Sequence, residues 1–328
     1  MNPLTDFLGS RPVDRGLIRI SAERPYQHEE AAYDQQYGVD KFDTAALAVE
    51  ARNAFEFCKA QGLPPDAPVL EIGCGTGRMS IGLAMQEGMG PLLITDPSPA
   101  FCRIVQDKLK DVQVQARSVD IAVLSAEDVA LLPPGSVSLI LLRSVLHHIA
   151  DVEGFIRSCA QVLPTGGLLV CEEPYYEGYM MMGFIGQFIE DALANAGYSC
   201  TDVDRERIRD LTATMQFYCR RDIDKSAAED KHLFRPDDLM VSGRAVNLEL
   251  SHFPNWRFTA SREQNEQGYA THFYRFFAAY IEYCMSWPPE FSRRVADASR
   301  KYFEFFTPLE TGGQTTPHCF GTFVFRKR

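Results

Sequence analysis

The sequence predicts an α/β fold in which a mostly parallel sheet carries helices on both faces and further helices are inserted beyond it. Three observations predict this fold. Apolar runs of strand length alternate with segments of helical length, the first run ends in a glycine-rich turn, and the second run ends in an acid. Strands that are buried on both faces appear as continuous apolar runs. Open sheets of this kind bind ligands at the carboxyl ends of their strands.

The first strand and the turn after it form the most informative local pattern. Residues 69–72 are a largely apolar run with β-branched members, bounded by prolines before it and glycines after it, which predicts a buried parallel strand. Three glycines between residues 73 and 77 allow a sharp turn and bring a ligand against bare main chain. The next segment, 78–87, is compatible with a helix that packs on the sheet.

The second apolar run, residues 92–96, ends at Asp96. An acid in this place can hold two neighbouring ribose hydroxyls, because each carboxylate oxygen accepts a hydrogen bond. Nicotinamide-binding proteins share that arrangement, but their G-x-G-x-x-G fingerprint is not met, since position 78 is an arginine. The G-x-x-x-x-G-K-[ST] pattern of a phosphate-binding loop is also absent after this strand.

The spacing E-x-G-x-G-x-G from Glu71 to Gly77 resembles motif I of the class I S-adenosylmethionine (SAM)-dependent methyltransferases. SAM carries a sulfonium and an ammonium cation and no phosphate, so an acid near the loop suits it. The stretches LHHI at 146–149 and LPTGG at 163–167 resemble further motifs of this family. The resemblance covers about residues 65–174 and is closest in style to small-molecule O-methyltransferases. It implies a seven-stranded, mostly parallel Rossmann-like sheet with SAM as cofactor.

The resemblance also implies cofactor contacts. In the family, an acid after the third strand accepts a hydrogen bond from the adenine amino group. Ser125 stands in that place here, so either Ser125, Glu127 or Asp128 makes the contact. Arg143 meets the cofactor's methionine carboxylate, steers an acidic acceptor, or forms a salt bridge with a nearby acid. The implied cofactor-binding residues are Glu71, Gly73, Cys74, Gly75, Gly77, Asp96, Pro97, Ser125, Ala126, Glu127 and Arg143.

Candidate catalytic residues follow the fourth and fifth predicted strands. His147 and His148 come just after the fourth strand, and Glu173 comes after the fifth. Resemblance to sugar and natural-product O-methyltransferases implies His147 as general base, Glu173 as the partner that fixes its tautomer, and His148 as a substitute. The alternative is that one ring only shapes the loop by a local hydrogen bond. We expect no metal site, because adjacent histidines usually point apart.

Four parts are expected along the chain. They are an N-terminal helical segment (1–64), the SAM-binding core (65–174), a helical lid or substrate insertion (175–235), and the remainder of the core with a helical insertion (236–328). The expected strands are 69–72, 92–96, 121–124, 136–144, 168–171, 248–252 and 320–325. The expected helices are 43–61, 78–87, one opened by prolines 97 and 99, one capped by Asp151, 236–246, and two aromatic-rich patterns at 273–284 and 291–305. We expect the aromatic residues to form core or dimer contacts rather than a substrate cage.

The composition narrows the possible partners. The net charge of −11 argues against nucleic acid, whose binding depends on lysine and arginine at phosphates. No apolar stretch approaches the roughly 20 residues that span a bilayer. The nine cysteines contain no C-x-x-C pair, which is typical of a reduced compartment without a zinc site. We expect a cytoplasmic protein that binds a small-molecule acceptor, with a homodimer as its candidate assembly.

The sequence therefore favours a SAM-dependent methyltransferase that moves a methyl group by in-line displacement to a small molecule, most plausibly to a hydroxyl. An N- or S-methyltransferase of a small metabolite and a non-catalytic SAM-binding protein remain alternatives. An amino-methylating enzyme of RNA or DNA would carry Asn/Asp-Pro-Pro-Tyr/Phe after the fourth strand, where residues 143–146 read Arg-Ser-Val-Leu.

Overall fold

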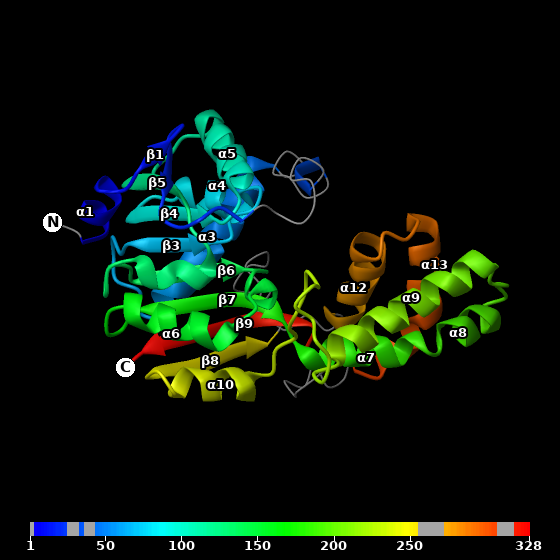
Figure 1. The fold of residues 1–328 in the computed structure, drawn as a ribbon. Coiled ribbons are helices and arrows are strands. Elements are labelled where there is room, and N and C mark those ends of the chain that lie inside the picture. The colour runs from blue at the N-terminus through cyan, green and yellow to red at the C-terminus, as the bar shows by residue number, and fades with distance from the viewer. Residues whose placement is uncertain (1–2, 25–32, 36–42, 255–271, 307–317) are drawn as a thin grey trace.

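The fold is a single twisted sheet with helices on both faces and a helical cap beyond the carboxyl ends of its central strands (Figure 1). It is described from a computed structural model of the 328-residue chain, which describes residues 3–24, 33–35, 43–254, 272–306 and 318–328. In these ranges the sheet has nine strands in the order β1-β2-β5-β4-β3-β6-β7-β9-β8. The strands are β1 (Val13–Asp14), β2 (Leu17–Arg19), β3 (Val69–Ile72), β4 (Pro91–Asp96), β5 (Ser118–Val123), β6 (Leu139–Arg143), β7 (Leu168–Pro174), β8 (Leu248–Pro254) and β9 (Phe320–Lys327).

The strands from β5 to β7 run parallel, and β9 and β8 close the sheet antiparallel. The sequence predicted seven strands, and all seven are present. The difference is the hairpin of β1 and β2, which adds two strands at the edge beside β5. Strands of two and three residues are too short to leave a readable alternation of apolar and polar residues, which explains why the sequence did not predict them.

Helices cover both faces because successive strand residues point to opposite sides. Val69 packs in one hydrophobic core with helices α3, α4 and α5, whereas Leu70 packs in a second core with α1, α6 and α10. The helices begin where the sequence predicted, with Asp43, Ser98 and Asp151 as N-caps whose side chains accept backbone N–H groups. Their bounds are α1 (Pro3–Gly9), α3 (Thr44–Ala60), α4 (Arg78–Ala84), α5 (Pro99–Lys108), α6 (Val152–Val162) and α10 (Pro236–Arg244).

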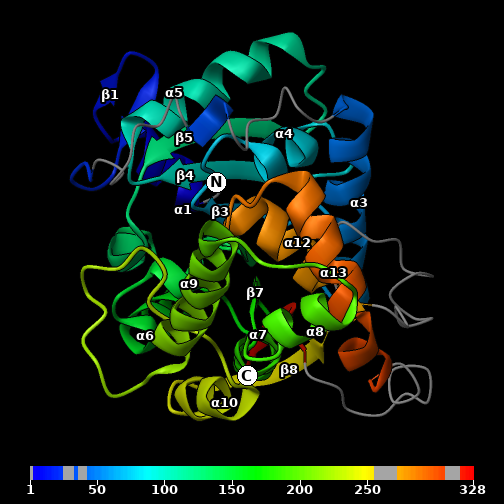
Figure 2. The same ribbon diagram turned by 90° about the vertical axis from the view of Figure 1, so that its right-hand side faces the viewer.

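The helical cap combines two segments that are far apart in the sequence. Figure 2 looks from the cap toward the sheet and shows its helices in front of the strands. The cap has its own hydrophobic core, in which Met182, Leu211, Phe277 and Val295 are buried together. The aromatic-rich segments at 273–306 thus contribute to a core, as expected, although Phe305 is exposed. The cap helices are α7 (Tyr176–Gly186), α8 (Ile189–Asn195), α9 (Asp202–Cys219), α12 (His272–Ala279), which continues into a π-helical turn at Tyr280–Cys284, and α13 (Pro289–Glu304).

The register of the sheet brings the candidate residues to one edge. Ile72 of β3 lies opposite Thr95 of β4 and Leu142 of β6, so these three strands end together. Arg143 lies opposite Glu172 on β7. The loops that follow β3, β4, β6 and β7 therefore meet at the edge that the cap faces (Figure 1).

Candidate active site

The glycine loop after β3 offers bare main chain toward open space. Gly73, Gly75 and Gly77 all adopt positive φ angles, of 71°, 49° and 94°. A Cβ placed on Gly73 would lie 2.6 Å from Cγ2 of Val145, so glycine is required there for packing. A Cβ placed on Gly75 would meet nothing within 4 Å. Gly75 is therefore the point at which a ligand can approach the backbone closely.

Asp96, at the end of β4, is joined directly to this loop. Its Oδ2 accepts a hydrogen bond from the N–H of Gly75 at 3.0 Å, and its Oδ1 accepts one from the N–H of Ser98 at 2.8 Å. Asp96 is buried. A carboxylate has about four acceptor positions, so these two bonds leave it able to accept ribose hydroxyls as well. The structure thus places the predicted acid beside the predicted loop.

Glu71 provides a second acid close by. Burial raises the pKa of Glu71 to about 7, and the charge of Asp96 contributes to the rise. Its Oε2 is buried and has no hydrogen bond of normal geometry among the residues that the structure describes, although the nearby hydroxyl of Ser80 lowers the pKa slightly. A buried acceptor without a donor costs about 1–3 kcal/mol. A ligand ammonium group would supply that donor, so this orphaned oxygen fits the cationic end of SAM.

The residues after β5 form a polar pair. The hydroxyl of Ser125 donates to Glu127, which also lies 3.2 Å from Nη1 of Arg24. The sequence left Ser125, Glu127 and Asp128 as alternatives for the adenine contact, and the structure joins the first two by a hydrogen bond. Ser125 and Ala126 are buried. These residues follow the strand next to β4 and so lie on the side of Asp96 where an adenine would extend.

Arg143 belongs to a buried ion-pair network. Its Nη1 lies 2.9 Å from Oε2 of Glu50 on α3, and its Nε lies 3.4 Å from Oε1 of Glu172. Arg78 binds the same Glu50 through two nitrogens, at 2.7 and 3.1 Å. Of the three roles proposed for Arg143, the structure supports the salt bridge. The sequence did not predict Glu50 as the partner.

The histidines lie in a 3₁₀ turn, Leu146–His148, that a buried carboxylate holds in place. Glu173 Oε1 accepts the N–H groups of Val145 and Leu146, at 2.8 and 2.7 Å. Its Oε2 lies 2.6 Å from Nδ1 of His147. The predicted His147–Glu173 pair is therefore present. Since Glu173 is fully buried and uses both oxygens, the pair is rigid.

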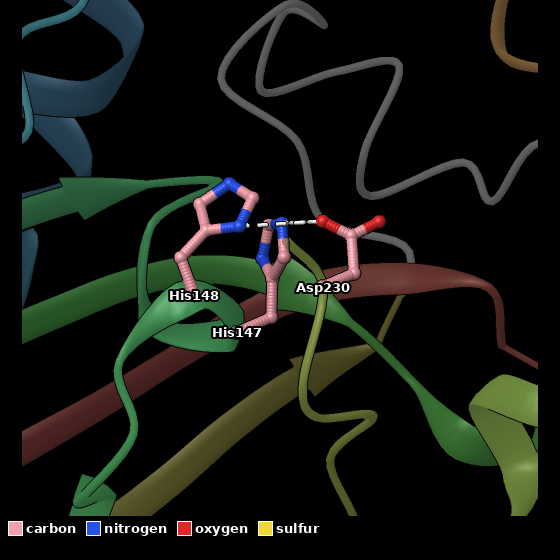
Figure 3. Close-up of side chains that lie close together, drawn as sticks. All are labelled: His147, His148 and Asp230. Carbon is pink, nitrogen blue, oxygen red and sulfur yellow. Dashed lines mark ion pairs between the residues drawn. The ribbon is translucent and has the colours of Figure 1, made fainter. Parts of the chain in front are cut away.

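A second carboxylate, which the sequence did not predict, lies on the other side of His147. Asp230 Oδ1 is 3.4 Å from Nε2 of His147 and 3.3 Å from Nδ1 of His148 (Figure 3). The two imidazole rings are neighbours, with centroids 4.0 Å apart. The expectation that adjacent histidines point apart is wrong for this pair, because the turn puts both rings on the same side of the backbone.

Main-chain hydrogen bonds hold Asp230 at this position. The N–H groups of Lys231 and His232 donate to the carbonyl of His147, at 2.8 and 3.3 Å. The carbonyl of Glu229 lies 3.0 Å from Nδ1 of His148. The segment that returns from α9 to the sheet thus rests on the histidine turn. Its acidic and basic residues resemble an ordinary solvated loop, so the sequence carried no signal for Asp230.

The ionisation of the two histidines differs. Burial alone lowers the pKa of His147, but the charges of Glu173 and Asp230 outweigh it and raise the pKa to about 10. The raised pKa favours the protonated form of His147 at neutral pH, and the general-base role suggested for His147 stays a prediction. Burial and the charge of His147 lower the pKa of His148.

A cavity of about 580 Å³ lies elsewhere on the returning segment. Tyr218, Lys225, His232 and Arg235 are among its lining residues, together with the first turn of α6. None of the predicted site residues lines it. The cavity adjoins the histidine turn, because Lys231 and His232, which donate to the carbonyl of His147, line it.

Comparison with known proteins identifies the core. Residues 70–171 match a family described as "Methyltransferase domain". These residues form a class I methyltransferase domain. The domain spans the strands from β3 to β7 and includes the glycine loop, Asp96 and both histidines. SAM is the methyl donor of this domain class, and the orphaned oxygen of Glu71 and the open face of Gly75 fit it.

Curated relatives match about a third of the chain. The "Ubiquinone biosynthesis O-methyltransferase" of Xanthomonas campestris pv. campestris is 32% identical over 114 residues, which are 35% of this chain and 46% of that protein. The protein of the same name from Xanthomonas axonopodis pv. citri is also 32% identical over 114 residues. The match thus spans less than half the length of these relatives, and the helical cap lies outside the methyltransferase domain.

Solved structures match over more of the chain at low identity. A putative sarcosine dimethylglycine methyltransferase from Galdieria sulphuraria is 13% identical, with a TM-score of 0.46, and the match covers 91% of this chain and 97% of that one. A putative methyltransferase in complex with the Haloferax volcanii Trm112 activator is 13% identical, with a TM-score of 0.49 and coverage of 91% and 96%. Among the described helices of this chain, none is long and apolar enough to cross a membrane.

Proposed function

We propose that this chain transfers the methyl group of SAM to a hydroxyl of a small molecule. One observation carries the proposal. The open backbone face at Gly75, the buried acids Asp96 and Glu71, and the polar cluster around His147 all lie at one edge of the sheet. A donor site and an acceptor site are thereby placed side by side, which is what in-line displacement needs.

The residues of the chain divide the binding of the donor among them. When bound, SAM supplies an electrophilic methyl group on its sulfonium. The main chain at Gly75 admits the ligand closely, Asp96 accepts its ribose hydroxyls, and Glu71 accepts from its ammonium group. Ser125 and Glu127 supply polar atoms for the adenine amino group.

Two observations support an oxygen acceptor of small size. The curated relatives that match the domain are named as O-methyltransferases. The cap helices stand in front of the strand ends in Figure 2, and a cap in this position favours an acceptor of small size. Acceptor attack forms the O–C bond, the S–C bond breaks with its electron pair on sulfur, and the hydroxyl proton leaves to water.

The histidine turn positions the acceptor in this proposal. Glu173 locks the orientation of His147, which makes His147 a positioning residue. The side chains of His148 and Asp230 are 37% and 40% exposed, so these two members of the cluster are the ones that contact the acceptor.

Binding of S-adenosylhomocysteine, the spent donor, tests the first half of the proposal. Calorimetry on the pure protein is expected to give one site, and Asp96→Ala is expected to weaken binding at least about tenfold because two hydrogen bonds of a charged group are lost. Asp107→Ala, an exposed acid on α5, is the matched control and is expected to bind normally. Unchanged binding by Asp96→Ala would contradict the assignment.

Transfer of a labelled methyl group tests the second half. Labelled SAM is incubated with the protein and a cell extract that is separated into small-molecule and macromolecular fractions. The label is expected in the small-molecule fraction, in an alkali-stable ether. Label found only in protein or nucleic acid would refute the acceptor class.

A further inference from the structure

We propose that His147, His148 and Asp230 form a binding site for a divalent transition-metal ion, of which zinc is the representative. One potential ligand atom from each residue lies within 4.8 Å of the others (Figure 3). The three residues come from two segments, the turn after β6 and the segment that returns from α9. No pattern in the sequence predicts that Asp230 lies beside the two histidines.

The distances in the cluster suit a bridging ion better than direct hydrogen bonds. Asp230 Oδ1 lies 3.4 Å from the nearest nitrogen of His147 and 3.3 Å from that of His148. Hydrogen bonds between N–H and oxygen cluster at about 2.7–3.2 Å. Bonds of about 2.0–2.1 Å from a tetrahedral zinc ion place neighbouring ligand atoms about 3.3–3.4 Å apart. The two separations from Asp230 match edges of such a tetrahedron, and the two histidine nitrogens lie within 4.8 Å of each other. Nδ1 of His148 also lies 3.0 Å from the carbonyl of Glu229, so it gives up that contact when it binds the ion.

Glu173 provides the support that metal-binding histidines commonly have. Its Oε2 contacts Nδ1 of His147, which directs the other ring nitrogen, Nε2, toward Asp230. Metal-ligating histidines usually donate their second N–H to a carboxylate in this way, and the contact fixes the tautomer and the ring orientation. Because two backbone N–H groups hold Glu173 Oε1, the orientation of His147 is set before any ion binds.

The charge and chemistry of the cluster select the kind of ion. Two carboxylates, the fully buried Glu173 and the partly buried Asp230, flank His147 and favour a positive charge there. A zinc ion that binds at Nε2 of His147 displaces the proton of that nitrogen to water. Two imidazoles and one carboxylate suit zinc, iron or a similar ion, whereas magnesium and calcium prefer oxygen ligands. Three protein ligands leave a coordination position open, as in catalytic zinc sites.

The open coordination position can bind the acceptor hydroxyl. This role rests on the proposed methyl transfer. A dication lowers the pKa of a hydroxyl that binds to it. The acceptor hydroxyl would release its proton to water on binding, and its oxygen would be held ready beside the methyl group. An acceptor that presents an alcohol or phenol oxygen fits this position.

Zinc binding by the metal-free full chain tests the proposal without any acceptor. The protein is freed of metal by a chelator and dialysis, then titrated with zinc in competition with a chromophoric chelator. One zinc ion per chain is expected. His148→Ala and Asp230→Asn are each expected to weaken zinc binding by more than 100-fold, and Glu173→Gln by about 10–100-fold, the usual effect of losing a supporting contact.

Two control variants separate this site from adventitious binding. His252→Ala removes an imidazole on β8, and Cys200→Ser removes a partly exposed thiol just before α9; both are expected to bind zinc like the wild type. Absence of zinc binding overturns the proposal, as does binding that survives both His148→Ala and Asp230→Asn. Binding of S-adenosylhomocysteine is measured on the same samples and reports that each variant is folded. A chain that binds this nucleoside but no zinc refutes the metal site and leaves the proposed function intact.

Discussion

The substitution Gly75→Ala is expected to weaken ligand binding while the protein still folds. Gly75 has a φ of +49°, and a Cβ at this position would meet nothing within 4 Å. Gly75→Ala is therefore expected to cost only the strain of a left-handed backbone, about 1–2 kcal/mol. The same methyl group projects into the space that we assign to the nucleoside. We expect the affinity for S-adenosylhomocysteine to fall at least about tenfold, which corresponds to about 1.4 kcal/mol.

Gly88→Ala is a closely matched control. Gly88 has a φ of +70°, and its Cβ would likewise meet nothing within 4 Å, but it lies in the turn between α4 and β4, away from the strand ends. Both variants are expected to lose similar stability in urea denaturation, because both place alanine in the left-handed region. Calorimetry then compares their binding. A folded Gly75→Ala protein with the affinity of Gly88→Ala would refute our placement of the ligand.

Three further predictions concern stability and pH. Arg143→Ala removes a partner of two acids and is expected to destabilise the protein by about 3–5 kcal/mol in urea denaturation, because it removes one member of a buried ion-pair network; a loss below 1 kcal/mol would contradict a structural role. Glu71 has a folded-state pKa near 7 against 4.5 when unfolded, so the folded state binds more protons and stability is expected to fall as the pH rises from about 4.5 to 7. Glu71→Gln removes a contribution of up to about 3 kcal/mol to this fall, and an unchanged pH profile would refute the raised pKa. Thr201→Ala breaks the capping box of α9 and is expected to cost about 0.5–2 kcal/mol, measured by thermal unfolding against the exposed control Asp202→Ala, which should cost less.

The strands near the donor site could be predicted from local sequence. The runs that became β3, β4, β6 and β7 are largely apolar, and their polar ends predicted Asp96, His147 and Glu173 at a common edge. The spacing of the glycines predicted the loop, because its positive φ angles exclude most other residues. These features depend on neighbours in the sequence.

The remaining features depend on contacts between distant segments. Glu229, which contacts His148, is 81 residues away from it, and no pattern in the sequence indicates this contact. Asp230 was missed for the same reason, and so was its contribution to the raised pKa of His147. The cap core was missed as a unit because α7 and α9 pack with α12 and α13, which the sequence places on the other side of β8.

A crystal structure of the protein with S-adenosylhomocysteine tests the central claim most directly. We predict that both ribose hydroxyls lie within hydrogen-bond distance of the Asp96 carboxylate, that the ligand contacts the main chain at Gly75, and that its sulfur faces the turn that carries His148. A ligand bound elsewhere, or a ribose out of reach of Asp96, would contradict the account.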